Sequence, residues 1–167
     1  NLEKIVKESI KKYGEFITAC NCKVSLAAEK KPPKAYMDPL QMVTIADALI
    51  DNAVRYSQTK GKVNISLKKV KNYLLLKIQD NGIGIPSDQQ QLVFSKFFRA
   101  RNAMRAQTEG LGLDLYITKK IIEASGGKID FKSRENKGTV FNVYLPLEKY
   151  QFENVSKQKE EEPDEIL

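Results

Sequence analysis

The stretch Asp80-Asn81-Gly82-Ile83-Gly84-Ile85 follows directly on residues 73–79, an apolar-rich run that predicts a β-strand. A carboxylate at the end of a strand, followed by two glycines one residue apart, can form a pocket as well as a turn. Glycine lets the backbone pass close to a flat ligand and adopt positive φ. Asp80 can accept a hydrogen bond from an exocyclic amine, and Ile83 and Ile85 can line the same ligand. The pattern indicates a nucleobase site, although an ordinary turn is the commoner reason for glycine after a strand.

The composition is that of a soluble domain with its own core: 167 residues, of which 41% are hydrophobic and 29% charged. No apolar run approaches the roughly 18 residues that span a membrane, and no signal peptide is visible. The sequence starts at Asn1 without a Met, so we expect a piece of a longer protein. Cys20 and Cys22 have no second cysteine pair and the chain has no His, so reduced cytosolic thiols are expected instead of a zinc site.

The net charge of +7 is unevenly distributed along the chain. Residues 150–167 contain six acids and two lysines, a net charge of −4, so the remaining residues carry +11. A body this basic suits a polyanion such as nucleic acid, a membrane surface or a triphosphate. No aromatic residues are interleaved among the lysines, so nucleic-acid binding has no specific support.

Hydrophobic periodicity predicts an α+β fold. Helices are expected at residues 2–21, 39–56 and 110–126, with a short helix at 87–94, and strands at residues 23–29, 35–37, 62–70, 73–80, 128–134 and 139–147. Asp38, before Pro39, is expected to cap the second helix, and Ser87 the short one. These elements predict a two-layer α/β sandwich in which a mixed, mostly antiparallel sheet packs on about three helices.

Two segments lack periodicity. Residues 95–109 are rich in Arg, which predicts a mobile lid-like loop. Residues 149–167 are charged and poor in apolar side chains, which predicts a disordered acidic tail.

On the helix at residues 39–56, Asn52 lies outside the apolar arc, and Arg55 and Tyr56 lie within about 60° of it on a helical wheel. This strip presents an amide oxygen suited to Mg²⁺, a guanidinium suited to phosphate and a ring suited to a base. A solvated helix face is the alternative interpretation. Further along, Gly110-Leu111-Gly112 opens a helix whose free backbone N–H groups favour anions, although glycines of a flexible loop are the commoner explanation of this pattern.

Several nucleotide-binding classes are excluded by the sequence. The glycines after Asp80 lack the extension and the following helix of a Rossmann fingerprint, and no Gly-x-x-x-x-Gly-Lys-[Ser/Thr] motif is present. The His-Arg-Asp motif of the eukaryotic-type protein kinases is impossible without His.

In its order of motifs, the chain resembles the ATP-binding catalytic domain of sensor histidine kinases, of the GHKL ATPase superfamily. The matching segments are the N box at Ile45–Ser57 (IADALIDNAVRYS), the G1 box at Asp80–Ile85 (DNGIGI), the F box at Phe94–Arg99 (FSKFFR), the G2 box at Gly110–Leu113 (GLGL) and the final Gly-Thr-x-Phe at 138–141. The resemblance covers roughly residues 2–147, and the combination of motifs is specific even though each motif is not.

The resemblance implies ATP and Mg²⁺ as cofactors. It implies Asn52 as the Mg²⁺ ligand, Arg55 at phosphate and Asp80 as acceptor of the adenine amino group. No catalytic residue is expected in this piece, because the phosphoacceptor His is absent. The residues implied in nucleotide binding are Asn52, Arg55, Tyr56, Asp80, Gly82, Gly84, Ile85, Phe97, Arg99, Gly110, Leu111, Gly112, Leu113 and Thr139.

Three departures from the family pattern affect the expected activity. Ala48 occupies the position where relatives often have a second Asn, or a water-activating Glu in gyrase-type ATPases, which argues against efficient hydrolysis. Where the family usually has Gly-x-Gly-Leu-Gly-Leu, the chain has Thr108-Glu109 before Gly110–Leu113, which stiffens the lid hinge and adds a negative charge. The absence of His removes the phosphoacceptor helix pair.

The resemblance further implies three parts: a lead-in helix at 1–21, an ATP-binding catalytic domain at 22–148 with a lid at 95–109, and the tail at 149–167. The domain would supply the γ-phosphate to a His on a separate dimerisation domain, in a homodimer that acts on a response regulator in two-component signalling. We expect a cytoplasmic location, no nucleic-acid partner and no direct membrane contact by this piece; the intact protein can carry a membrane anchor.

Two alternatives stay open from the sequence. One is a GHKL serine kinase of the anti-sigma-factor type, which acts on a partner protein without a His-bearing helix pair. The other is a degenerate binding module in which Ala48, Thr108 and Glu109 record lost turnover. The affinity for ATP and the sequence before Asn1 discriminate among these.

Overall fold

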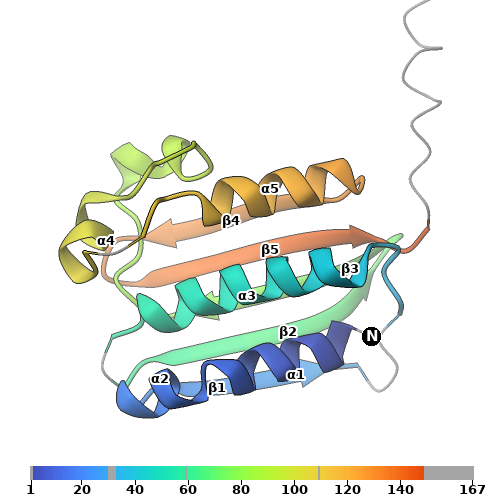
Figure 1. The fold of residues 1–167 in the computed structure, drawn as a ribbon, viewed down its shortest axis with the longest axis horizontal. Coiled ribbons are helices and arrows are strands. Elements are labelled where there is room, and N and C mark those ends of the chain that lie inside the picture. Colours follow the sequence, from blue (N-terminus) through green and yellow to red (C-terminus); the bar gives the residue numbers. More distant parts are fainter. Residues whose placement is uncertain (1, 30–32, 59, 109, 149–167) are drawn as a thin grey trace, which may run out of the picture.

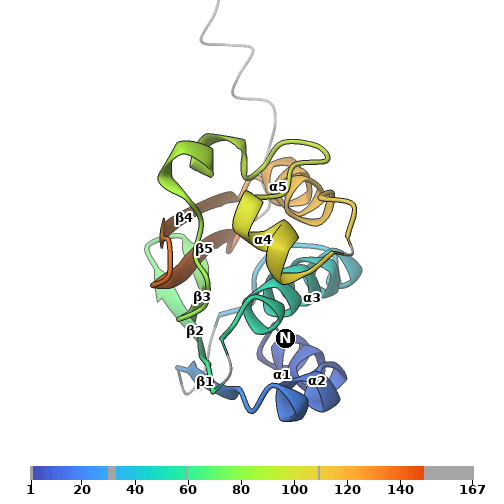
Figure 2. The same ribbon diagram turned by 90° about the vertical axis from the view of Figure 1, so that its left-hand side faces the viewer.

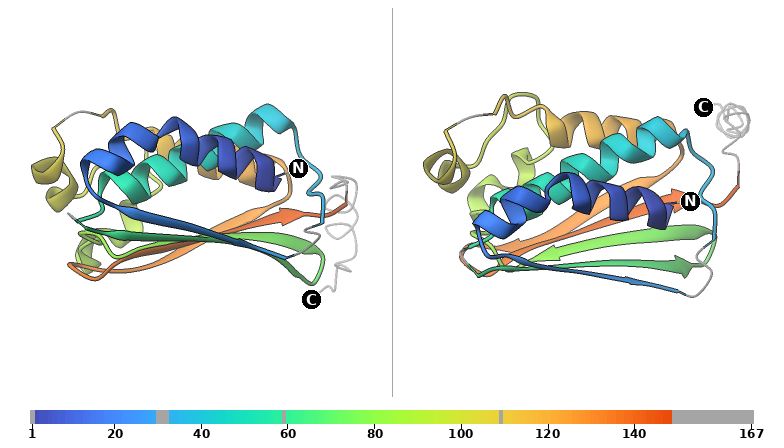
Figure 3. Two further views of the ribbon diagram at one scale, coloured as in Figure 1. Left: turned by 90° about the horizontal axis from the view of Figure 1, so that it is seen from below. Right: turned by 60° about the horizontal axis from the view of Figure 1, so that its bottom comes forward.

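The computed structural model describes residues 2–29, 33–58, 60–108 and 110–148 (Figure 1). The elements in chain order are α1 (Leu2–Lys12), α2 (Gly14–Ala19), β1 (Lys23–Ala28), α3 (Pro39–Arg55), β2 (Lys62–Val70), β3 (Tyr73–Asp80), the 3₁₀ helix η1 (Ser87–Leu92), α4 (Arg101–Ala106), α5 (Asp114–Ala124), β4 (Lys128–Arg134) and β5 (Gly138–Pro146). Figure 3 shows two layers, with α1, α3 and α5 on one face of the sheet. The predicted α+β sandwich is confirmed.

The sheet is mixed and mostly antiparallel, as predicted. Its strand order is β1-β2-β3-β5-β4, and only the β1–β2 pair among the described strands is parallel. Ile78 pairs with Ile65 on one side and Phe141 on the other, so apolar side chains from three strands form a row on the face that the helices cover. The register places the carboxyl end of β3, where Asp80 lies, beside the start of β5.

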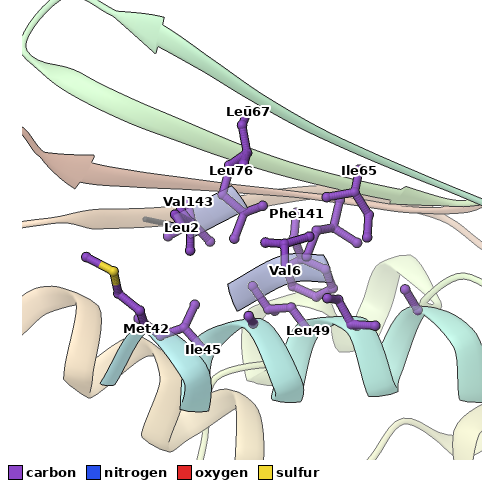
Figure 4. Close-up of a cluster of buried hydrophobic side chains, with 14 of the residues drawn as sticks. Leu2, Val6, Met42, Ile45, Leu49, Ile65, Leu67, Leu76, Phe141 and Val143 are labelled. Atoms are coloured by element: carbon purple, nitrogen blue, oxygen red, sulfur yellow. The ribbon is translucent and has the colours of Figure 1, made fainter. Parts of the chain in front are cut away.

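The core lies between α3 and the sheet (Figure 4). Ile45 and Leu49 of α3 are at most 1% exposed, and they face Ile65, Leu76 and Val143 of the sheet. Each such side chain stabilises the fold by roughly 1.5–3 kcal/mol. The helix starts where predicted, because Oδ1 of Asp38 accepts hydrogen bonds from two first-turn N–H groups at 2.7 and 3.3 Å.

The predicted helix at 2–21 is wrong in one respect, since it is two helices. Tyr13 leaves the helical region, with φ −92° and ψ 11°, and Gly14, a poor helix former, begins α2. Val6 of α1 is fully buried in the common core, so this segment packs as part of the sandwich. After the break, α2 brings Phe16 to the surface of α3 near Arg55, with 44% of the side chain exposed.

Three smaller predictions are also wrong. Residues 35–37 form no strand; the backbone N–H of Tyr36 donates to the carbonyl of Pro146 at 2.8 Å instead of joining a ladder. Ser87 does not cap η1, because Pro86 occupies the N-cap position. The segment predicted as a loop at 95–109 contains α4. The predicted disorder of residues 149–167 lies outside the described residues.

Within the part of the chain that the structure describes, no helix combines the length and apolarity that crossing a membrane requires.

Candidate functional site

A cavity of about 320 Å³ opens where α3, the end of β3, the segment around α4, the start of α5 and the start of β5 meet. Figure 2 views this end of the molecule, with α4 in front of the ends of α3 and α5. The volume falls in the roughly 300–1,000 Å³ range of small-molecule sites. The predicted site residues that line it are Asn52, Arg55, Tyr56, Asp80, Gly84, Ile85, Arg99, Gly110, Gly112 and Thr139.

Asp80 lies at the sheet end of this cavity. Its Oδ1 accepts hydrogen bonds from the backbone N–H of Gly82 at 2.8 Å and of Thr139 at 3.2 Å. Burial raises the pKa of the Asp80 carboxyl to about 6, although these two bonds favour the charged form and oppose the rise. The hydrogen bonds fix the carboxylate plane, and Oδ2 is left as the acceptor for a ligand.

The glycines after Asp80 permit a tight turn beneath the cavity. A Cβ on Gly82 would lie 2.2 Å from the carbonyl oxygen of Tyr56, so the end of α3 and this turn are in contact only because Gly82 has no side chain. Gly84 has φ +61°, and a Cβ there would lie 2.1 Å from the carbonyl oxygen of Arg134. Gly82 therefore shapes the site from below, without lining the cavity itself.

Ser133, which the sequence did not indicate, ties three segments of the sheet end together. Its Oγ accepts from the backbone N–H of Ile85 at 2.9 Å and lies 2.9 Å from Oγ1 of Thr139. It also donates to the carbonyl of Gly138 at 3.0 Å. This network links Ile85 and Thr139, which both line the cavity.

On α3, the side-chain amide of Asn52 has its nitrogen engaged in a hydrogen bond and its oxygen available. Its Nδ2 donates to the carbonyl of Ala48 at 2.9 Å, which fixes the rotamer and leaves Oδ1 as the free atom at the cavity. No group of three or more His, Cys, Asp or Glu suited to a metal ion occurs among the described residues. An amide oxygen at the rim fits Mg²⁺, which proteins commonly bind through one or two side chains together with the substrate's phosphates.

Arg55 reaches the cavity, but its guanidinium is already bound to a carboxylate. Nε and Nη2 of Arg55 donate to Asp51 at 2.9 and 2.8 Å, and this pairing raises the pKa of the guanidinium. On its other side the guanidinium carbon lies 5.8 Å from the ring centroid of Phe16. Tyr56 follows as the helix C-cap and also lines the cavity.

Among the residues that precede α5, those that line the cavity differ in part from those predicted. Phe98 lines the cavity, whereas Phe97 does not and is 70% exposed. Arg99 donates to the carbonyls of Gln107, Thr108 at 2.9 Å and Gly110 at 3.4 Å, so it binds the backbone of the segment between α4 and α5, part of which was predicted as a lid. Neither Leu111, which is 74% exposed, nor Leu113 lines the cavity. Glu109, expected to add negative charge, lies outside the described residues.

α4 anchors this lid to the Gly82–Gly84 turn. Asn102 Nδ2 donates to the carbonyl of Gly84 at 2.8 Å and to that of Ile83 at 3.3 Å. Ala100 and Ala103 line the cavity, where small side chains leave room. The short helix lay in a segment without periodicity, so nothing in the sequence indicated these contacts.

Ile83, which the sequence indicated beside Ile85, also lines the cavity. Other cavity residues that the sequence did not indicate are Asp51, Ala53, Val93, Asp114, Leu115 and Phe141. Most of them neighbour predicted residues or belong to the apolar faces of predicted elements. Asp114 suggests a second register for the glycine motif: residues 110–115 also differ from Gly-x-Gly-Leu-Gly-Leu at one position only, with Asp114 in place of the third Gly. The structure favours this register, because its final Leu, Leu115, lines the cavity, whereas Leu113, the final Leu of the other register, does not.

Comparison with known proteins identifies the class. Residues 37–149 match the family described as histidine kinase-, DNA gyrase B- and HSP90-like ATPase, and the chain belongs to this family. This confirms the predicted membership of the GHKL superfamily.

Among its relatives, the sensor protein kinase WalK of Staphylococcus epidermidis is 37% identical over 116 residues, which are 68% of this chain and 19% of that protein. The sensor protein CiaH of Streptococcus pneumoniae is 32% identical over 111 residues, 66% of this chain and 25% of that protein. The chain thus spans about a fifth to a quarter of the curated relatives it matches.

Among solved structures, the catalytic domain of histidine kinase ThkA has a TM-score of 0.75 and 26% identity, covering 87% of this chain and 94% of that one. ThkA in complex with response regulator protein TrrA matches with a TM-score of 0.72 and 26% identity, covering 89% of this chain and 41% of that one. These similarities place the chain among the catalytic domains of sensor histidine kinases of two-component signalling.

Proposed function

We propose that this domain binds Mg²⁺-ATP and supplies the γ-phosphate for phosphorylation of a His on a separate dimerisation domain of the same protein. The proposal rests on the arrangement of groups in the cavity. The Asp80 carboxylate lies at one end, and the free Oδ1 of Asn52 and the start of α5 lie at another. The first suits an amino-substituted base, and the second suits a metal-bound triphosphate.

At the base end, Oδ2 of Asp80 accepts the hydrogen bond of an exocyclic amine. Thr139 and Gly82 hold the other carboxylate oxygen, so the acceptor does not rotate away. Ile85, Tyr56 and Phe98 supply apolar surface to the base. A guanine would present a carbonyl oxygen to this carboxylate at the equivalent position, so the site prefers adenine.

At the phosphate end, Gly110 and Gly112 place the first turn of α5 at the cavity, where its unpaired N–H groups face an anion. Arg55 contacts phosphate after exchanging its contact with Asp51. Asn52 Oδ1 would hold Mg²⁺, which would neutralise charge on the triphosphate. The protein's contribution to phosphoryl transfer is then positioning and charge neutralisation.

Ala48 favours transfer of the γ-phosphate to a protein over hydrolysis of ATP. One turn before Asn52 on α3, it offers no side chain that could activate water. This favours transfer to a nucleophile from outside this domain over hydrolysis, and in our proposal a His of the dimerisation domain fulfils that role. The structure of ThkA in complex with response regulator TrrA supports a response regulator as the next acceptor. We further propose that the parent protein is homodimeric and that this domain is cytoplasmic.

The proposal is tested by calorimetric titration with Mg²⁺-ATP and Mg²⁺-GTP, followed by a phosphorylation assay. We expect ATP to bind and GTP to bind much more weakly. The longer parent protein should gain acid-labile, base-stable phosphate on His, while this chain alone gains none. ATP binding without any phosphoryl transfer by the parent protein would favour a degenerate binding module. Label on Ser or Thr of a partner protein would favour the serine-kinase alternative.

A further inference from the structure

The ionisable side chains around the cavity do not make it positive, although the chain as a whole carries +7. Three acids and two bases line it: Asp51, Asp80, Asp114, Arg55 and Arg99. A triphosphate site is ordinarily surrounded by an excess of positive charge, because the anion is attracted by the summed field. The chain's surplus of Lys and Arg therefore lies outside this site.

The five charges differ in how far they are already compensated. Asp51 and Arg55 neutralise each other through two hydrogen bonds. Asp80 lies at the base end, where Gly82 and Thr139 donate to it.

The remaining two charges lie nearer the phosphate end. Arg99 keeps its charge but directs its donors at lid carbonyls. For the carboxylate of Asp114, the described part of the chain provides neither an ion pair nor a hydrogen bond.

Asp114 occupies the first residue of α5, the helix turn that Gly110 and Gly112 bring to the cavity. A carboxylate at that position interacts favourably with the positive end of the helix dipole. The carboxylate therefore offsets part of the positive electrostatic potential with which this helix end would otherwise attract phosphate. An uncomplexed triphosphate entering the cavity meets a fixed negative charge there.

We propose that Asp114 makes this site selective for nucleotide complexed with a divalent cation over free nucleotide. The inference rests on the proposed ATP-binding function and specifies the form in which the nucleotide is taken. A divalent cation bound to the triphosphate would cancel about half of its charge, so the repulsion from Asp114 would be roughly halved. The same repulsion weakens the binding of free nucleotide, and Arg55 offsets it only in part, because phosphate must compete with Asp51 for the guanidinium.

The test is the ratio of two affinities within one variant: ATP with Mg²⁺ and ATP with EDTA, each measured by calorimetry. Asp114→Asn keeps the size and polarity of the side chain. We expect affinity for ATP in EDTA to rise roughly tenfold, as for removal of one charge some 6 Å from phosphate at intermediate dielectric, and affinity for Mg²⁺-ATP to rise by only about threefold, because about half of the charge is cancelled. Because both values come from the same variant, a change in fold stability cancels from the ratio.

Glu8→Gln is the matched control, because it removes one negative charge from an exposed position on α1, away from the cavity. It should leave the ratio unchanged. Equal changes in both affinities, or none, for Asp114→Asn would overturn the inference, as would a marked loss of Mg²⁺-ATP affinity, which would make Asp114 a metal ligand.

The same titrations separate this inference from the proposed function. If neither protein binds ATP under either condition, the proposed function and the inference both fail. If wild type binds and the ratio is unaffected by Asp114→Asn, only the inference fails.

Discussion

Arg55 is bound by Asp51, one turn earlier on α3, through two hydrogen bonds of 2.9 and 2.8 Å. Both residues line the cavity, and Phe16 of α2 covers the guanidinium from the other side. The side chain that we assign to phosphate therefore has a partner on its own helix and a contact with the lead-in segment. A phosphate has to compete with Asp51 for the same donors, so the strength of this pair sets part of the nucleotide affinity.

Replacing Asp51 with Asn should tighten Mg²⁺-ATP binding by roughly three- to fivefold, because it frees the guanidinium and removes a negative charge. The pair is partly exposed and spaced i,i+4, so its loss should cost only about 0.3–0.5 kcal/mol of unfolding free energy. Calorimetry and thermal denaturation check the two values.

Asp47→Asn is the control for this change. Asp47 lies on the same helix as Asp51, and its replacement breaks the ion pair with Lys12 of α1. Asp47 does not line the cavity, so nucleotide affinity should not change. A drop in affinity for Asp51→Asn would show instead that Asp51 positions Arg55 for phosphate.

Asp80→Asn should stabilise the protein at neutral pH while abolishing nucleotide binding. Burial raises the Asp80 pKa from 3.8 to about 6, so between these values the folded state retains a proton that the unfolded state has lost. Raising the pH through this window therefore destabilises the wild-type fold, by about 3 kcal/mol at most. Asn keeps an oxygen for Gly82 and Thr139 and carries no charge, so it escapes this loss.

Chemical denaturation at several pH values checks the stability difference. The variant and wild type should have equal stability below about pH 4 and diverge up to about pH 7. A difference independent of pH would mean that packing, not ionisation, separates them. Unchanged affinity for a fluorescent ATP analogue would disprove the assignment of Asp80 to the base.

The sequence predicted the elements with strong periodicity and missed those determined by tertiary contacts. The helix at α3 was predictable because Asp38 and Pro39 mark its start and its apolar arc is continuous. The break at Tyr13 was not, because the apolar period continues through Gly14. α4 was missed because its position depends on Asn102 bonding to the backbone of Gly84, a contact 18 residues away.

In the site too, residues that belong to a clear motif were predictable from the sequence, and the orientation of side chains in an irregular segment was not. Asp80 and its glycines were identifiable because few functions need a carboxylate and two glycines at a strand end. Phe97 was predicted where Phe98 lines the cavity, because an irregular segment has no period from which orientation can be read. The pairing of Arg55 with Asp51 followed the i,i+4 rule, but the sequence does not tell whether a carboxylate or a phosphate binds the guanidinium.

Gly82→Ala should destabilise the fold by several kcal/mol and weaken nucleotide binding. The added Cβ would lie 2.2 Å from the carbonyl oxygen of Tyr56 and 2.9 Å from Oδ1 of Asp80, so α3 and the turn must separate. Overpacking of this kind typically costs about 1–3 kcal/mol or more. Gly14→Ala is the matched control, because nothing lies within 4 Å of its added Cβ, and in α2 it should be neutral or stabilising by up to about 1 kcal/mol. Similar denaturation midpoints for the two variants would contradict the close contact at Gly82.

Arg99 should act on the lid through its hydrogen-bonding fork and not through charge alone. Its guanidinium bridges the carbonyls of Gln107, Thr108 and Gly110, which follow α4. Arg99→Lys keeps the charge but cannot make the planar set of bonds, so amide hydrogen exchange within residues 105–112 should accelerate as much as in Arg99→Ala. Arg101→Lys is the control, because Arg101 pairs with the exposed Asp88 on η1 and its replacement should leave that exchange unchanged. If Arg99→Lys retained wild-type exchange while Arg99→Ala did not, a positive charge would suffice and the bridging role would be wrong.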